Sequence, residues 1–359
     1  MENSLPIKEH LIKLERVLNA TGAGPGYLRL EKNEGLVPFP KEFIQEIQRA
    51  ITADYISKYP ELSSLYGSIA GWVGQNRENI YLTAGSDAAI KTVFEVFVSP
   101  GDKIAILHPT YAMYYVYARM FQAKLLEIEC KEDLSFSVDE ILSCIKNEKL
   151  RLICLANPNS PTGTVIPPDR LEEIIKLASE HSTVVLVDEA YYLFYPESSS
   201  RLVNQYPNLV VTRTFSKALG LASARLGFVV GSKDMIAALH KVRPMYEVNA
   251  LGAIFVEKLL EHPEIIDRNI SLTLAGKKYL EAELDKLGLR YFKSQANFVL
   301  IEVGSFERSS EIVKKLRERK ILIKGSFGHK YLRNCIRVTV GTSEQMSLFI
   351  KELKDILRS

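Results

Sequence analysis

Cysteine is scarce in this sequence and does not cluster. The four cysteines are Cys130, Cys144, Cys154 and Cys335, none of them in a C-x-x-C pair and none beside a group of histidines. Zinc sites and disulfide frameworks need clustered or paired ligands. We therefore expect no metal site and no disulfide framework. Reduced thiols are typical of a cytoplasmic protein.

Long apolar runs and an excess of charge of one sign are also missing. No stretch approaches the ~18 uncharged apolar residues of a transmembrane helix. Residues 1–18 are amphipathic and charged, without the apolar segment of a signal peptide. The net charge is only +3 and is spread along the chain. We therefore expect a cytoplasmic protein whose partners include neither nucleic acid nor a membrane.

The chain does contain enough apolar residues for a large core and more than one domain, with 359 residues and 47% hydrophobic content. Short runs rich in Val, Ile and Leu alternate with helical patterns. This alternation predicts a mainly parallel sheet covered on both faces, which binds ligands at the carboxyl ends of its strands. The predicted strands are residues 79–83, 103–107, 150–155, 183–187, 208–212 and 226–230, and two predicted helices are residues 87–98 and 169–179.

The pattern changes near residue 245. A long helical stretch, interrupted near Pro263, is followed by alternating strands and helices. The predicted fold class is therefore α/β, with a large domain over residues 41–244 and a smaller α+β domain made of residues 1–40 and 245–359. The elements predicted in the smaller domain are helices over 250–287, 309–319 and 343–357 and strands over 297–303 and 336–340.

Lys217 directly follows a predicted strand, in the sequence Thr214-Phe215-Ser216-Lys217. Burial or a nearby cation turns such a lysine into a nucleophile, although most lysines are surface charges. Asp188 also ends an apolar strand, 217 − 188 = 29 residues earlier. A buried carboxylate needs a cationic partner, and a protonated pyridine nitrogen is one. The alternative is an aspartate that caps a turn.

Gly85-Ser86-Asp87 lies between a predicted strand and a predicted helix. Free backbone N–H groups at a helix start favour an anion such as phosphate, and Arg225, 225 − 217 = 8 residues after Lys217, could pair with it. The alternatives are a plain helix cap and a surface arginine. The loop at residues 157–163, with two prolines and a glycine, either holds side chains rigidly or is an ordinary turn.

Taken together, these segments resemble the fold-type I PLP (pyridoxal 5′-phosphate) enzymes, the class I/II aminotransferases. Within them the sequence is most similar to the histidinol-phosphate aminotransferase group. The resemblance covers nearly the whole chain. It rests on Tyr59-Pro60, Gly85-Ser86-Asp87, Pro109-Thr110-Tyr111, the loop at 157–163, Asp188-Glu189-Ala190-Tyr191, Ser216-Lys217, Arg225 and Arg337-Val338-Thr339-Val340-Gly341.

The resemblance implies a PLP-dependent transferase fold and assigns roles at the cofactor. Lys217 would bind PLP covalently and later carry the proton between substrate and cofactor. Asp188 would keep the pyridine nitrogen protonated, Tyr191 would donate to the phenolic oxygen, and Tyr111 would stack on the ring. The residues expected around the phosphate are Ser86, Asp87, Ser216 and Arg225.

The resemblance also assigns residues to the substrate and to a second subunit. Arg337 matches the arginine that clamps the substrate carboxylate. Asn33 and Glu34 match a segment lining the substrate entrance, or else form a polar turn. Tyr59 matches the tyrosine that reaches the phosphate in the neighbouring active site, which implies a homodimer.

Two positions depart from the family pattern. The family's asparagine before Pro-Thr-Gly, which contacts the phenolic oxygen, is replaced by Ser160, with Asn159 one position earlier. Either residue could contact the cofactor. A second family arginine, which helps to hold a substrate phosphate, is replaced by Lys324, at 337 − 324 = 13 residues before Arg337. Lysine keeps the charge without the fork geometry, so an anionic substrate is expected while imidazole specificity is not.

Three functions follow from the resemblance. The first is an aminotransferase that moves an amino group between a donor such as glutamate and a small, phosphorylated carbonyl or amine substrate. The second is a PLP-dependent decarboxylase of threonine or serine phosphate, because the bond broken depends on fine positioning. The third, a PLP-binding regulator, is disfavoured because no helix-turn-helix pattern or basic block precedes the large domain.

Overall fold

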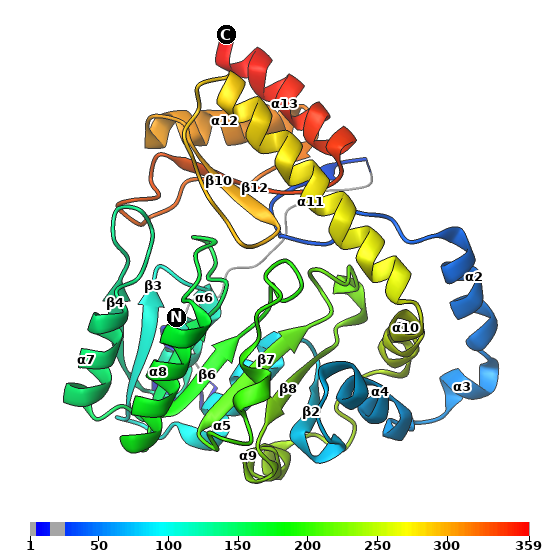
Figure 1. The fold of residues 1–359 in the computed structure, drawn as a ribbon, viewed down its shortest axis with the longest axis vertical. Coiled ribbons are helices and arrows are strands. Elements are labelled where there is room, and N and C mark those ends of the chain that lie inside the picture. The colour runs from blue at the N-terminus through cyan, green and yellow to red at the C-terminus, as the bar shows by residue number, and fades with distance from the viewer. Residues whose placement is uncertain (1–4, 15–25, 359) are drawn as a thin grey trace.

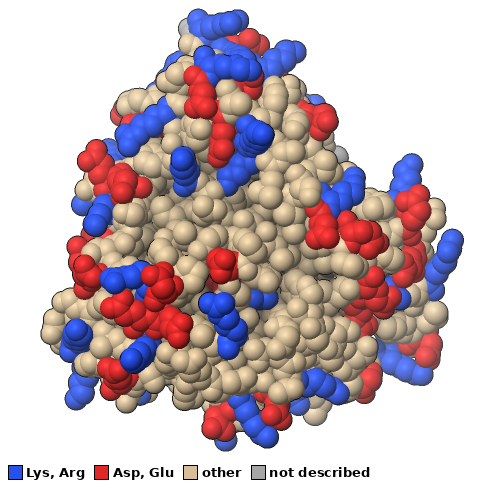
Figure 2. Space-filling view, in the orientation of Figure 1, with Lys and Arg blue, Asp and Glu red and all other residues tan. Residues whose placement is uncertain are grey.

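The structure is a computed structural model that describes residues 5–14 and 26–358. Part of the amphipathic N-terminal segment therefore lies outside the described residues. Among those residues, no helix combines the length and the apolar run that a membrane crossing would require. Figure 2 shows Lys and Arg side chains interspersed with Asp and Glu over one face of the molecule. All four cysteines are free thiols.

A seven-stranded sheet forms the larger part of the molecule (Figure 1). In spatial order its strands are β2 (Ile80–Thr83), β8 (Gly227–Gly231), β7 (Leu209–Thr214), β6 (Val184–Asp188), β5 (Leu152–Ala156), β3 (Lys103–His108) and β4 (Lys124–Glu129). Only β8 runs antiparallel to its neighbours; the other pairs are parallel. The predicted mainly parallel sheet and its six predicted strands are confirmed. β4 was missed because it is an edge strand with a largely exposed pattern.

Helices cover both faces of this sheet, as predicted. Successive side chains of a strand point to opposite faces, so Val185 and Val187 of β6 join one core while Val184 and Leu186 join the other. The first core is covered by α2 (Lys41–Ala50), α4 (Ser63–Val73), α7 (Val138–Glu148), α8 (Pro168–Glu180) and α10 (Ala250–Glu261), and the second by α5 (Ser86–Phe97), α6 (Ala112–Met120) and α9 (Lys233–Leu239).

A second, antiparallel sheet lies above the first in Figure 1 and packs against helices. The predicted α+β pattern of this part is confirmed. Near the N-terminus, β1 (Leu28–Arg29) pairs with β11 (Ile321–Leu322), so this segment packs on the second part as expected. The remaining elements here are β9 (Tyr291–Phe292), β10 (Phe298–Glu302), β12 (Cys335–Thr339), α11 (Pro263–Lys286), α12 (Phe306–Glu318) and α13 (Ser343–Arg358).

α11 connects the two parts of the molecule. Its first turns contribute Ile265 and Ile266 to the core of the large sheet, together with α10, whereas Leu280 and Leu284 belong to the core of the small sheet. Figure 1 shows the helix running between the two parts. The division at residues 40 and 244 stays a prediction. The short elements are α1 (Glu9–Ile12), α3 (Ala53–Ser57), η1 (Arg77–Asn79), η2 (Ser199–Leu202), η3 (Ala222–Ala224) and η4 (His240–Val242).

Candidate active site

One cavity opens at the carboxyl ends of the parallel strands, where doubly wound sheets bind their ligands. Its wall is built from both parts of the chain: Asp188 ends β6, Lys217 follows β7, and Arg337 comes from β12 of the small sheet. Eleven of the residues predicted from the sequence line it. They are Asn33, Ser86, Asp87, Tyr111, Ser160, Asp188, Tyr191, Ser216, Lys217, Arg225 and Arg337.

Asp188 is a buried carboxylate, only 4% exposed, that lines this cavity. Its two oxygens accept hydrogen bonds at 3.1 Å from the hydroxyl groups of Thr212 and Tyr114. Burial nevertheless raises the pKa of Asp188 to about 6. A cation placed beside this carboxylate would favour its ionised form. Asp188 is therefore suited to hold a protonated ring nitrogen.

Lys217 presents its amino group in the same cavity, where Nζ donates to the carbonyl of Lys32 at 2.8 Å. Burial, followed by the positive charge of Arg337, lowers the pKa of Lys217 to about 8. An amine with this pKa is partly unprotonated near neutral pH. Because only the free amine attacks a carbonyl, Lys217 is poised to act as a nucleophile.

The rate of covalent PLP attachment to the cofactor-free protein should follow the free amine of Lys217. Below a pKa of about 8, the fraction of free amine rises about tenfold for each unit by which the pH increases. Above that pKa the fraction reaches a plateau. Stopped-flow absorbance of reconstitution between pH 6.5 and 9.5 measures this. Arg337→Leu should move the midpoint to higher pH. A wild-type midpoint near the ordinary lysine value of about 10.4 would contradict the assignment.

An anion cradle lies beside these two residues at the start of α5. Gly85 precedes the helix with a φ of +85°, and a Cβ built on it would lie 2.8 Å from Nη2 of Arg225. A Cβ on Gly227 would likewise lie 2.6 Å from the backbone N of Ser86. Only glycine permits this close packing. The arrangement combines a helix N-terminus with a guanidinium, which is the chemistry of a phosphate site.

Two tyrosines occupy different positions in the cavity. The hydroxyl of Tyr191 accepts a hydrogen bond from Nδ2 of Asn33 at 2.8 Å, and the side chain of Asn33 is also bonded to Thr339. Tyr111 lies at the start of α6 with its ring edge-on to Tyr114. Tyr191 can therefore bond a polar atom of a ligand, whereas Tyr111 offers a ring face at the cavity wall.

The two residues of the 157–163 loop that could contact the cofactor, Asn159 and Ser160, have different surroundings. Asn159 is 1% exposed, and its side chain bonds Thr110, Thr162 and the carbonyl of Pro109. Ser160 lines the cavity, with its hydroxyl 3.4 Å from Nη1 of Arg337. Asn159 thus stabilises the loop, and Ser160 is the residue placed to contact a ligand.

A second cavity adjoins the first and shares Tyr111, Ser160 and Arg337 with it. Lys324 lines this second cavity rather than the first. The backbone of Lys324 pairs with that of Arg337 in an isolated antiparallel bridge. The side chains of Arg337 and Lys324 therefore start from paired backbone positions; Arg337 lines both cavities, and Lys324 lines the second.

Besides Asn159 and Lys324, two more predicted site residues do not line the first cavity. Tyr59 is 76% exposed and stacks on Tyr246 with a ring-centroid distance of 4.1 Å. Glu34 forms an ion pair with Arg29 at 2.7 Å and lines a separate small cavity. In the single chain, neither contributes to the wall that Lys217 and Asp188 share.

Sequence reasoning missed several residues that shape the site. Tyr114 and Thr212 hold Asp188, and the carbonyl of Lys32 holds Lys217. Tyr114 could have been found, since three residues after Tyr111 on a helix is one turn away. Nothing in the sequence distinguishes Thr212 or Lys32 from other residues at strand ends and loops.

The family description "Aminotransferase class I and II" matches residues 25–353. The chain belongs to this family. Among its relatives, a histidinol-phosphate aminotransferase of Thermoanaerobacter sp. (strain X514) is 32% identical over 336 residues, which cover 93% of this chain and 94% of the relative. The predicted family and aminotransferase class are confirmed; in this family the cofactor is PLP.

Solved structures share the fold. A histidinol-phosphate aminotransferase of Sinorhizobium meliloti, in complex with pyridoxal-5′-phosphate, superimposes with a TM-score of 0.91 and 22% identity over 99% of both chains. An L-threonine-O-3-phosphate decarboxylase of Porphyromonas gingivalis gives a TM-score of 0.77 and 21% identity over 92% of this chain and all of that one. The predicted α/β fold class is confirmed.

Proposed function

We propose that this protein is a PLP-dependent aminotransferase that moves an amino group between a donor such as glutamate and a small, phosphorylated carbonyl or amine substrate. The observation that carries the proposal is the cavity where Lys217, Asp188 and the anion cradle meet. These residues fit PLP, because a buried carboxylate, a nucleophilic amine and a cradle at Gly85 match its ring nitrogen, aldehyde and phosphate.

The chain's own residues divide the chemistry. When bound, PLP supplies a ring that accepts the electron pair released at the substrate's α-carbon. Asp188 would hold the positive charge on the ring nitrogen, and Tyr191 would donate to the phenolic oxygen. Lys217, as a general base and acid, would take up the proton from the substrate's α-carbon and later release it. Tyr111 would keep water from one face of the ring.

The phosphate of the cofactor would be held at the start of α5. Arg225 and Ser86 stand at this helix end, and Ser216 lines the same cavity. Asp87 lies in the first turn, where its carboxylate accepts a hydrogen bond from Tyr117 at 3.0 Å. A carboxylate this close to phosphate would repel it, so we assign Asp87 to positioning through Tyr117 rather than to phosphate contact.

Arg337 and Lys324 define the substrate. Arg337 already donates to the carbonyl of Glu31 at 2.8 Å and to Ser160, which fixes its plane toward the first cavity. A planar carboxylate fits this guanidinium. Lys324 offers a second cation in the adjoining cavity. A substrate with a carboxylate or phosphate at one end and an anion at the other would engage both residues.

The assembly is part of the same proposal. Tyr59 and Tyr246 form an exposed stacked pair at the surface. In a homodimer this pair would be covered, and Tyr59 would be free to contact the partner's cofactor phosphate. A cytoplasmic location, expected from the unpaired cysteines, belongs to the proposal as well.

Lys324→Ala should weaken the binding of phosphorylated substrates and have little effect on the binding of glutamate. Loss of a hydrogen bond to a charged group costs about 1.5–3 kcal/mol, which corresponds to a rise in KM of about ten- to a hundredfold. The KM for glutamate should change less than threefold, about 0.6 kcal/mol. Steady-state kinetics with both substrates measure this. Lys314→Ala, at an exposed position on α12, is the matched control. Equal effects on both substrates would remove Lys324 from the phosphate site.

A single-turnover panel tests the function itself. The PLP form is mixed with amino acids, phosphorylated amines and phosphorylated amino acids, without a keto-acid acceptor. Conversion to pyridoxamine phosphate identifies an aminotransferase donor. Carbon dioxide release from threonine or serine phosphate, without pyridoxamine phosphate, would instead support the decarboxylase.

A further inference from the structure

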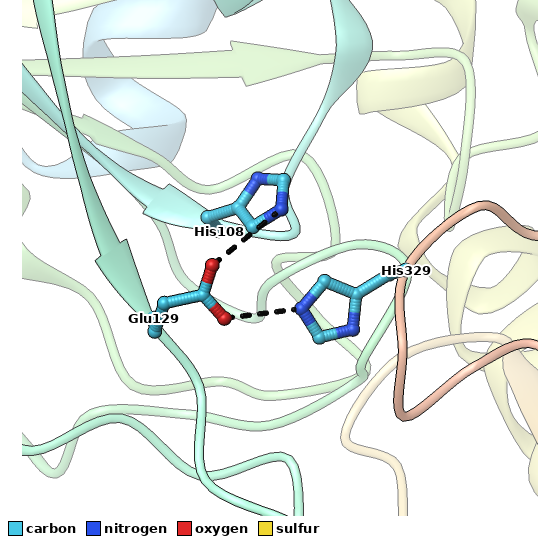
Figure 3. A group of neighbouring side chains, drawn as sticks. All are labelled: His108, Glu129 and His329. Atoms are coloured by element: carbon cyan, nitrogen blue, oxygen red, sulfur yellow. Dashed lines mark hydrogen bonds and ion pairs between the residues drawn. The ribbon is translucent and has the colours of Figure 1, made fainter.

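Two histidines and a glutamate come together at the rim of the second cavity. His108 ends β3, Glu129 ends the neighbouring strand β4, and His329 comes from the segment between β11 and β12 (Figure 3). One ligand atom from each residue lies within 4.8 Å of the other two. Both imidazoles line the second cavity. The three side chains thus converge from three separate elements on one point.

The separations suit a metal ion. Nε2 of His329 lies 3.3 Å and Nε2 of His108 lies 3.8 Å from the two oxygens of Glu129. Ligand atoms about 2.0–2.1 Å from a tetrahedral Zn²⁺ ion stand roughly 3.3 Å apart. Small side-chain rotations would close the set around an ion. Two imidazoles and one carboxylate favour transition metals over Mg²⁺ or Ca²⁺, which prefer oxygen ligands.

A further layer of polar groups supports His108. Its other ring nitrogen, Nδ1, lies 2.6 Å from the hydroxyl of Tyr115 and 3.4 Å from a carboxylate oxygen of Glu127. In the tautomer whose Nδ1–H donates to one of these groups, the lone pair of Nε2 would face Glu129. Histidine ligands of metals are usually oriented in this way.

Two contacts compete with a metal ion. The ammonium of Lys330 lies 3.6 Å from Glu129, but its side chain is 61% exposed and can turn toward solvent. Nδ1 of His329 accepts a hydrogen bond from the backbone N–H of Tyr331 at 3.3 Å. Coordination through Nε2 places the proton on Nδ1, so this long bond would be given up. Both costs reduce affinity without blocking the site.

We propose that His108, Glu129 and His329 form a binding site for a divalent transition-metal ion of the Zn²⁺ class, with water completing the coordination. The ion would tie the segment between β11 and β12, which carries Lys324, to the ends of β3 and β4. It would also add positive charge beside the cavity proposed for the anionic end of the substrate. The site does not depend on the aminotransferase assignment.

Direct metal binding tests the site. The PLP-loaded full-length protein is dialysed against a chelator and titrated with Zn²⁺ by calorimetry, with bound metal counted by mass spectrometry. We expect one Zn²⁺ per chain. His108→Ala, His329→Ala and Glu129→Gln should each lower affinity by more than about a hundredfold, and Tyr115→Phe by about tenfold. Lys330→Ala should raise the affinity.

The control is His181→Ala, which removes an exposed histidine outside the cluster and should bind Zn²⁺ as the wild type does. Circular dichroism shows whether each variant is folded. Because all variants carry PLP, any metal bound by the cofactor itself contributes equally to every protein and does not affect the comparison between them. Absence of saturable binding in the wild type would overturn the proposal. Binding that survives in all three ligand variants would do so too. The three residues would then form only a hydrogen-bonded link.

Discussion

Lys217→Ala should lower kcat/KM by about 10⁴-fold, the upper end of the range for a positioned general acid–base group. Lys217 is the amine in the cavity with a pKa lowered to about 8, and it stands beside Asp188 and the anion cradle. Its loss removes both the covalent attachment of the cofactor and the group that moves the α-proton. Single-turnover and steady-state kinetics measure the effect.

Borohydride trapping separates this role from a structural one. Treatment of the wild-type protein should fix the cofactor to the peptide that contains Lys217, as read by mass spectrometry. Lys176→Ala, on the exposed side of α8, should keep its activity within about twofold, or 0.4 kcal/mol, of wild type. A label on another lysine, or an active Lys217→Ala protein, would refute the assignment.

The features that the sequence predicts well are local. Asp188 ends an apolar strand and Lys217 closely follows another, and a strand's end fixes on which edge of the sheet its next residues lie. The same rule places Ser86, because it follows β2, whose end lies on the same edge. The strands β2, β6 and β7 run in the same direction, so these residues lie at one edge of the sheet even though β8 separates β2 from β7.

Contacts between the two parts of the chain could not be predicted from the positions of strand ends. The bond from Asn33 to Tyr191 spans 158 positions, and Arg337 reaches the cavity from another sheet. Only the family resemblance pointed to Arg337. His108 and His329 are 329 − 108 = 221 positions apart in a sequence without a histidine cluster. They come together only because the segment between β11 and β12 packs against the edge of the large sheet. That packing depends on side-chain contacts between distant parts of the chain, which no local sequence pattern predicts.

Asp188→Asn should be the second most damaging substitution. The amide has nearly the shape of the carboxylate but no charge, so the cationic ring nitrogen would be left without its partner. Breaking a buried pair costs about 3–5 kcal/mol, which corresponds to a loss of about 10²- to 4 × 10³-fold in kcat/KM. The cofactor should also bind more weakly, as measured by equilibrium dialysis.

The pH dependence distinguishes loss of this charge from loss of packing. Burial raises the pKa of Asp188 to about 6, so the ionised fraction in the cofactor-free protein, and with it the affinity for PLP, should fall as pH drops through this value. The hydrogen bond from Tyr114 lowers that pKa. Tyr114→Phe should therefore move the acid-side loss of affinity to higher pH while keeping most of the affinity at pH 8. In Asp188→Asn the part of this change that comes from Asp188 should disappear, which leaves only the titration of the cofactor's own phosphate, whose second pKa is about 6. If the whole change persists there, another residue carries the charge that holds the ring nitrogen.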